Sequence, residues 1–237
     1  VVTLLLGRWF WRKTVDSFKT HFAEFDRSEL LASSMPLLGV VLMNIVITWS
    51  PMLFLGVWES SENVGIYSAA SRTAMLTSFV LVAVNSIAAP KFAALYQQGD
   101  IQALGAVARS SAKIMIVLAT PVLLLFLLFP EWILSLFGEE FKQGAVVLMI
   151  LSVGQFINVA TGSVGYLLMM SGQERLMRNN LLFSATVGVL LILWLVPNYG
   201  IVGGAISAAI TLSMQNIIAM LLVSKKLNIM TVPWKKM

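Results

Sequence analysis

Stretches of about 18 or more predominantly apolar residues follow one another along the chain. A helix of that length, at 1.5 Å per residue, crosses a hydrocarbon core about 30 Å thick. The length of the stretches is therefore more informative here than their periodicity. The pattern predicts an all-α, polytopic membrane helix bundle with six transmembrane helices, at 30–57, 64–96, 101–129 (fully apolar from 114), 143–170, 180–196 and 201–223.

Both ends of the chain differ from this six-helix part. Residues 1–7 are apolar and are preceded by neither an initiating Met nor a basic region, so we interpret them as the end of a transmembrane helix whose beginning is missing, not as a signal peptide. Residues 8–29 mix charged and aromatic side chains, which is typical of a linker at the membrane surface. We therefore divide the chain into 1–29, a six-helix lobe at 30–223, and a basic tail at 224–237.

The composition excludes a water-soluble protein. Hydrophobic residues make up 58% of the 237 positions and charged residues 11%, whereas a soluble domain carries roughly 25% charged residues. The chain has no cysteine and a single histidine, so we expect no disulfide, no zinc site and no bound cofactor. The net charge of +5 forms no basic patch with interleaved aromatic residues, so we expect no nucleic-acid partner.

Lysine and arginine alternate between the loops as six spans require. Short cytoplasmic loops are enriched in both residues. The segments before the first span, between the second and third, between the fourth and fifth, and after the sixth hold 14 of the 16 basic residues. The opposite loops hold five glutamates and Lys142. We therefore predict a multi-pass protein of the cell (inner or plasma) membrane with a cytoplasmic C-terminus.

Arg72 lies about two turns inside the second predicted span. An arginine at that depth is unfavourable by at least about 2.5 kcal/mol unless it faces water or a partner, so it marks a functional site by default. Its guanidinium suits an anionic group such as a pyrophosphate, to which it donates two parallel hydrogen bonds. The alternative is structural: the side chain extends to the membrane surface or donates to a backbone carbonyl.

Amide side chains inside the spans are the other candidates for a polar groove. The candidates for substrate binding are Asn44, Asn85, Gln155 and Asn158, together with Arg72. For each amide taken alone, interhelical hydrogen bonding is the competing role. No aspartate or glutamate lies near the middle of a predicted span, which argues against a proton relay or a cation site in these helices.

Several segments resemble the polysaccharide-biosynthesis flippases, which translocate O-antigen units and other lipid-linked oligosaccharides and belong to the multidrug/oligosaccharidyl-lipid/polysaccharide exporter superfamily. The segments are SENVGIYSAASR at 61–72, APKF at 89–92, LMMSGQER at 168–175 followed by Asn179 and Asn180, and PNYGIVGGA at 197–205. The resemblance covers the chain from about residue 28 to 223, and the order and spacing of the segments carry it.

The resemblance implies a fold, an activity and a set of partners. Family members have twelve or more helices in two six-helix lobes around a central cavity, and this chain is similar to the C-terminal lobe, so an N-terminal lobe of the same protein is the expected partner. The implied activity is flipping of an undecaprenyl-pyrophosphate-linked oligosaccharide across the cytoplasmic membrane by alternating access, in contact with membrane lipid. No covalent bond is made or broken, so we expect no enzyme. Arg72 matches an arginine common in the family.

Three other functions stay open from the sequence. A multidrug or cation extruder of the same superfamily shares the lobe but uses carboxylates inside the membrane, which these spans lack. A membrane scaffold that transports nothing is the second alternative, because one lobe cannot enclose a cavity. A membrane enzyme such as a sugar polymerase is the third, and the short external loops argue against it.

Overall fold

The computed structural model describes the backbone of residues 27–231 and the side chains of residues 34–231. By its contacts the chain divides into two units, 1–35 and 36–237. Of the first unit only the beginning of helix α2 is described. The predicted stub at 1–7 and most of the predicted linker therefore lie outside the described residues, and the arrangement below is that of the second unit.

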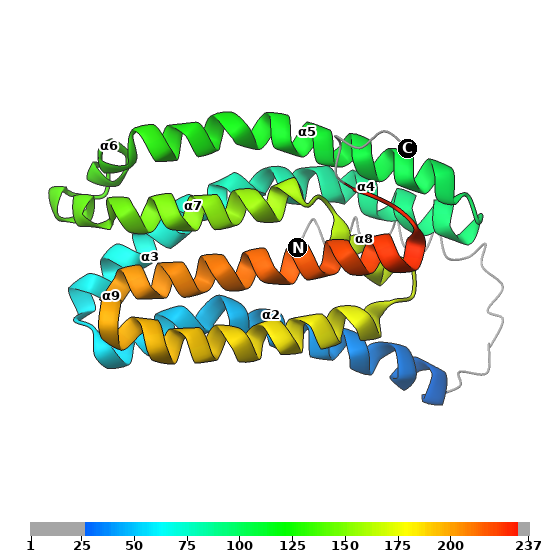
Figure 1. Cartoon of the computed structure of the whole chain (residues 1–237), viewed down its shortest axis with the longest axis horizontal. Helices are drawn as coiled ribbons and strands as arrows, with labels where there is room; N and C mark the ends of the chain where they lie inside the picture. The colour runs from blue at the N-terminus through cyan, green and yellow to red at the C-terminus, as the bar shows by residue number, and fades with distance from the viewer. Residues whose placement is uncertain (1–26, 232–237) are drawn as a thin grey trace, which may run out of the picture. The chain divides into compact units, whose positions relative to one another are not determined.

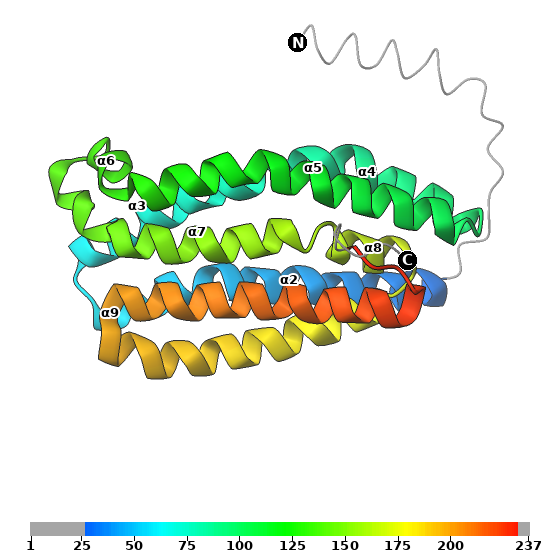
Figure 2. The ribbon, with the colours of Figure 1, turned by 45° about the horizontal axis from the view of Figure 1, so that its top comes forward.

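The described residues are helical almost throughout and contain no strand, which confirms the predicted all-α class. Figures 1 and 2 show the long helices of the second unit lying side by side. Their bounds are α2 Arg27–Trp58, α3 Ser61–Met75, η1 Leu76–Ser78, α4 Phe79–Gln97, α5 Ile101–Leu128, α6 Pro130–Ser135, η2 Glu139–Gly144, α7 Ala145–Ala160, α8 Val164–Met170 and α9 Glu174–Leu227.

Local signals set the ends of these helices. Ser60 caps α3 by accepting a hydrogen bond from the Asn63 backbone N–H at 3.2 Å. Asp100 caps α5 in the same way through the Ala103 N–H at 2.8 Å. The turn between α4 and α5 uses Gly99 at φ +74°, a conformation in which a Cβ is unfavourable. The predicted second span is thus one helical path from α3 through η1 to α4.

The predicted span at 143–170 is not a single helix. α7 ends at Ala160, the chain turns at Gly162 (φ +76°), and the short helix α8 begins at Val164. Gly162 fits here because it adopts this φ without strain and approaches Ala112 closely: a Cβ on Gly162 would lie 3.0 Å from the Ala112 Cβ. The interpretation of this segment as one continuous helix is therefore wrong: α7 and α8 are separate helices.

The last two predicted spans form a hairpin. α9 is one helical element except at Gly200, whose φ of +56° and ψ of −135° reverse the chain. Its two halves then pack antiparallel, because residues before the turn meet residues after it in reverse order: Asn180 with Gln215, Gly188 with Thr211, and Leu195 with Gly203. α9 therefore accounts for two spans, as the sequence predicts.

Small residues allow the helices around α7 to approach closely. α7 packs against α3, α5 and α9. A Cβ on Gly154 of α7 would lie 2.8 Å from the Ala209 Cα on α9, so this crossing depends on glycine. Apolar clusters lie on either side, one around Leu148 near the start of α7 and one around Leu168 in α8. α7 and α8 therefore lie against several other helices of the bundle.

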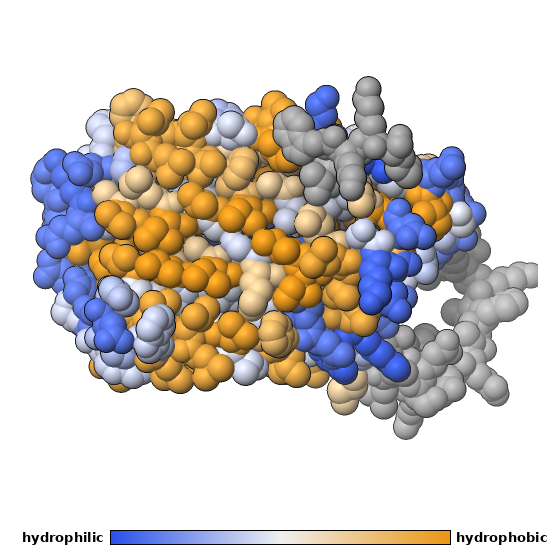
Figure 3. Space-filling view, viewed as in Figure 1, coloured by the Kyte–Doolittle hydropathy of each residue, from blue (hydrophilic) through white to orange (hydrophobic). Residues whose placement is uncertain are grey.

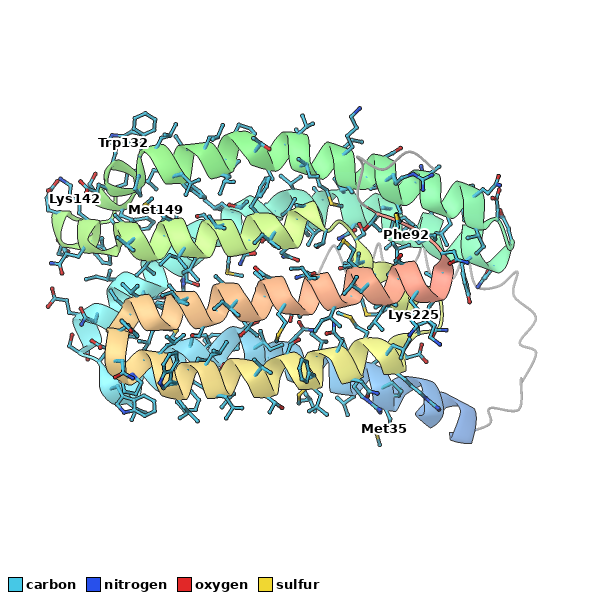
Figure 4. The ribbon with its side chains drawn as sticks, in the orientation of Figure 1. Met35, Phe92, Trp132, Lys142, Met149 and Lys225 are labelled. Carbon is cyan, nitrogen blue, oxygen red and sulfur yellow. The ribbon has the colours of Figure 1, made fainter. Side chains whose placement is uncertain are left out.

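The face drawn in Figure 3 is hydrophobic along the helices and hydrophilic at its two ends. Within the described residues, five elements are long and apolar enough to cross a membrane, and the fifth, Glu174–Leu227, crosses twice because of its turn. Trp132 and Lys142 lie at one end and Lys225 at the other (Figure 4). A bilayer covers such a surface, whereas water does not.

The orientation in the membrane is testable, because the chain contains no cysteine of its own. Ser61→Cys and Glu140→Cys lie at the Lys142 end, and Gln98→Cys lies at the Lys225 end; Ser61, Glu140 and Gln98 are exposed. We expect a membrane-impermeant thiol reagent added outside the cell to label the first two and not the third, since the second end carries the excess of lysine and arginine. The reverse labelling pattern would invert the orientation.

Candidate substrate groove

Arg72 lies on an open face of α3. It is 11 residues after Ser61, which places it about 16 Å along the helix, well inside the span. Gly65 and Ser68 precede it at helical spacing on the same face. A Cβ on Gly65 would meet nothing within 4 Å, and Arg72 itself is exposed in this chain. The arginine thus ends a strip of small and polar residues in which Gly65 and Ser68 are half-buried and Arg72 is exposed.

α2 forms the opposite wall of a cavity beside Arg72. The cavity has a volume of about 220 Å³. α2 contributes Thr48, Trp49 and Met52, and α3 contributes Arg72 with its neighbours. A hydroxyl, an indole and a guanidinium therefore lie around one space at the depth where the rest of the surface is apolar.

A second cavity continues the first toward α7. Its volume is about 110 Å³, and it brings Gln155 of α7 to the same space. The two cavities share Thr48, Tyr67, Ser71 and Met75, so we treat them as one feature and call it the Arg72 groove. The Arg72 groove is thus bounded by α2, α3, α7 and the second half of α9.

Arg72 has no carboxylate partner among the described residues. The ion pair found among the described residues joins Lys142 to Glu139, so no carboxylate within that part of the chain neutralises Arg72. The carboxylates of residues 34–231 lie at the ends of helices, away from the groove. A guanidinium without a counter-ion attracts an anion, and its planar fork matches phosphate oxygens.

Of the other predicted binding residues, three lie on helices that bound this groove, and Asn85 lies at the break between α7 and α8. Asn44 is one helical turn from Thr48 on α2 and donates to the Val40 carbonyl at 2.9 Å. Asn158 is one turn beyond Gln155 on α7 and is half-buried. Gln155 therefore lines the Arg72 groove, whereas Asn44 and Asn158 lie one turn from lining residues and do not line it themselves.

Asn85 lies elsewhere, at the break between α7 and α8. It is buried, with 3% of its surface exposed, and its Oδ1 accepts a hydrogen bond from the Ser163 hydroxyl. The partner is 78 residues away in sequence, so this bond ties α4 to the broken helix. The geometry of Asn85 fits an interhelical hydrogen bond, which the sequence offered as the alternative to substrate binding. Asn85 does not line the Arg72 groove.

The Asn85 contact leads to a stability prediction. Asn85→Ala leaves the buried Ser163 hydroxyl without this partner, and interhelical hydrogen bonds in membrane proteins contribute about 0.6–2 kcal/mol. We expect a lower melting temperature for the purified full-length protein in detergent. Ser86→Ala is the matched control, because the adjacent Ser86 is exposed and donates only within its own helix, to the Ala83 carbonyl. Equal melting of both variants would show that the Asn85 bond is not structural.

The polar and aromatic groove residues that were not identified from the sequence are Thr48, Trp49, Tyr67, Ser68 and Ser71. The sequence could have indicated Tyr67 and Ser71, since they are five and one residues before Arg72 in the same polar stretch. Thr48 and Trp49 had none, because their nearness to Arg72 depends on how α2 crosses α3. Within the described residues no group of three histidines, cysteines or carboxylates is placed to hold a metal ion.

A bundle of membrane-crossing helices with a polar groove open to one side is the architecture of a multi-pass membrane transporter. The comparisons with known proteins agree. Residues 36–196, more than half of the chain, match the model of the MatE family, and the chain belongs to this family. Together with the relative described next, this match confirms the resemblance to the polysaccharide flippases of the exporter superfamily.

A curated relative supports the same class. The chain is 24% identical over 172 residues to a protein of Haloferax volcanii named "Probable low-salt glycan biosynthesis flippase Agl15". The match covers 72% of this chain and 36% of that relative, so the chain spans about a third of the relative's length. No solved structure matches. The family and the relative indicate a transporter rather than an enzyme.

Proposed function

We propose that the full-length protein translocates an undecaprenyl-pyrophosphate-linked oligosaccharide across the cell membrane for surface polysaccharide synthesis. The observation that carries the proposal is Arg72, a guanidinium with no carboxylate partner among the described residues, inside a groove that opens on the membrane-embedded surface. The pyrophosphate is the part of such a substrate that a guanidinium binds best. Two N–H groups of the guanidinium donate parallel hydrogen bonds to two phosphate oxygens.

The remaining groove residues suit the rest of that substrate. Thr48, Ser71 and Gln155 offer hydroxyl and amide groups for sugar hydroxyls, and Trp49 offers an aromatic surface. The apolar surface beside the groove suits the polyprenyl chain, which needs no polar partner. In this proposal the oligosaccharide moves within the bundle while the lipid chain stays in the bilayer.

One lobe does not enclose a substrate, so the proposal includes a second. The groove is open on one side in the described chain, and the Haloferax relative is almost three times as long as the region it shares with this chain. We propose that an N-terminal lobe of the same protein closes the groove and that the two lobes alternate between access from the cytoplasm and from outside, with the C-terminus of this lobe in the cytoplasm.

Cation export is the competing function and the structure gives it less support. A site for an organic cation or a proton inside a membrane generally contains a carboxylate. Among residues 34–231 the groove holds an arginine and no aspartate or glutamate. An uncompensated positive charge there repels a cation, so an anionic head group is the better match.

Purified full-length protein in sealed vesicles distinguishes the two functions. A pyrophosphate-linked oligosaccharide lipid is placed in the inner leaflet, and its appearance outside is followed with an impermeant lectin. A fluorescent organic cation is tested in parallel vesicles. We expect the glycolipid to appear outside faster than in protein-free vesicles and the cation to stay enclosed. Export of the cation with no glycolipid movement would overturn the proposal in favour of drug extrusion.

A further inference from the structure

A second basic cavity lies away from the Arg72 groove, between the beginning of α5 and the segment that follows α9. Its volume is about 600 Å³. α5 contributes Gln102, Gly105 and Arg109, and the segment after α9 contributes Asn228 and Ile229. The Arg72 groove is bounded by α2, α3, α7 and α9, so the two cavities share no lining residue.

The chain builds this cavity by folding back after α9. Asn228 adopts the left-handed conformation (φ +53°), which ends the helix and is common for asparagine at this position. Ile229 then turns inward, is 2% exposed, and joins the apolar cluster that includes Leu104 and Ala108 of α5. The segment is thus held on α5 by apolar packing, and the cavity beside it is a feature of the folded bundle.

Arg109 lines this cavity beside Gly105. A Cβ on Gly105 would lie 3.3 Å from the Arg109 Nη1 and 3.7 Å from Ile229, so the missing side chain of Gly105 leaves room for the guanidinium. The lining contains no carboxylate. Asp100, at the start of α5, is engaged as the helix cap by the Ala103 N–H. A guanidinium with two nearby amide side chains, Gln102 and Asn228, therefore faces an open space.

The depth of Arg109 corresponds to lipid head groups. It is five residues before Ile114, where the fully apolar part of α5 begins, and this separation is about 7 Å along the helix. The polar layer on each side of the hydrocarbon core is of that thickness. This end of the described chain carries seven basic residues and two acidic ones, Asp100 and Glu174; the basic ones are Lys91, Arg109, Lys113, Arg175, Arg178, Lys225 and Lys226.

We infer that this cavity binds the phosphate head group of an anionic phospholipid, with Arg109 as the principal contact. Basic pockets between helices at the cytoplasmic face bind such head groups, and the neighbouring Lys113, one turn along α5, adds to the local potential. The inference does not rest on the proposed glycan substrate. It concerns a bulk lipid bound at the edge of the bundle.

Native mass spectrometry of the purified full-length protein tests the inference. Phosphatidylglycerol and phosphatidylcholine are supplied in turn, and the fraction of protein that retains one lipid is measured. We expect retention of phosphatidylglycerol and not of phosphatidylcholine, and a loss of about tenfold in apparent affinity for Arg109→Gln, since hydrogen bonds to charged groups are the strong ones. Gly105→Leu, which narrows the cavity beside Arg109 and keeps the charge, is expected to lower the affinity as well.

Lys225→Gln is the matched control. It removes one positive charge at the same end, but Lys225 does not line the cavity. We expect its affinity to stay within about twofold of the unchanged protein, because an exposed charge contributes little. Equal losses for Arg109→Gln and Lys225→Gln would reduce the effect to general attraction and overturn the inference. Displacement of the lipid by inorganic phosphate at equal concentration would overturn it as well, in favour of a soluble anion.

Discussion

Arg72→Ala in the full-length protein is expected to abolish surface polysaccharide while the amount of protein in the membrane stays unchanged. Arg72 is exposed and makes no ion pair among the described residues, so its removal breaks no ion pair in that part of the chain. It does take away the guanidinium of the Arg72 groove. Surface glycan is measured by staining or lectin binding, and protein level by immunoblot of the membrane fraction.

Two further variants separate geometry from charge at this position. Arg72→Lys keeps the positive charge but loses the planar fork, so we expect reduced rather than absent glycan. Lys142→Ala removes one positive charge in η2, at a residue that does not line the groove, and is expected to have no effect on surface glycan. A normal amount of surface glycan in Arg72→Ala would show that the Arg72 groove is not the substrate site.

Gly203→Ala is expected to be the most destabilising of the single methyl additions. A Cβ at Gly203 would overlap the Leu195 carbonyl oxygen, which belongs to the opposite arm of the α9 hairpin and is backbone. Backbone does not move aside as a flexible side chain does, so the two arms must separate. Overpacking of this kind is unfavourable by roughly 1–3 kcal/mol, and we expect the upper end of that range. The measurement is the yield and melting temperature of full-length protein in detergent.

Gly65→Ala provides the comparison within the same chain. Gly65 is also a helical glycine, but a Cβ there would meet nothing within 4 Å. Alanine is favoured over glycine in a helix by about 1 kcal/mol, so we expect an unchanged or slightly raised melting temperature. If both variants melt alike, the close contact between the arms of α9 is not what holds the hairpin.

The helices were largely predictable because the bilayer imposes a minimum length on them. Any stretch that crosses the core must be helical and apolar over about 20 residues, so α2, α5 and the α9 hairpin follow from run length alone. The break at Gly162 was not predictable in this way. Its neighbours Thr161 and Ser163 are small and mildly polar, and such residues occur equally inside continuous transmembrane helices. The Asn85 contact that accompanies the break joins residues far apart in sequence.

The candidate site was predictable only at its charged residue. Arg72 stands out because a charge inside an apolar span is unfavourable and therefore rare. Its neighbours Thr48 and Trp49 carry no such signal, since both residue types are ordinary on a membrane helix. Their place beside Arg72 depends on the crossing of α2 over α3, which is set by side-chain packing along the whole contact. Helix packing likewise decides that Gln155 lines the groove and that Asn85 lies at the break between α7 and α8.

Deletion of the full-length gene, with surface glycan and its lipid-linked precursor followed in the same cells, tests the central claim most directly. The account predicts that glycan disappears from the surface, that the lipid-linked oligosaccharide accumulates on the cytoplasmic side, and that the whole protein reverses both changes. Unchanged glycan, or loss of glycan without accumulation of the precursor, would contradict translocation of this substrate.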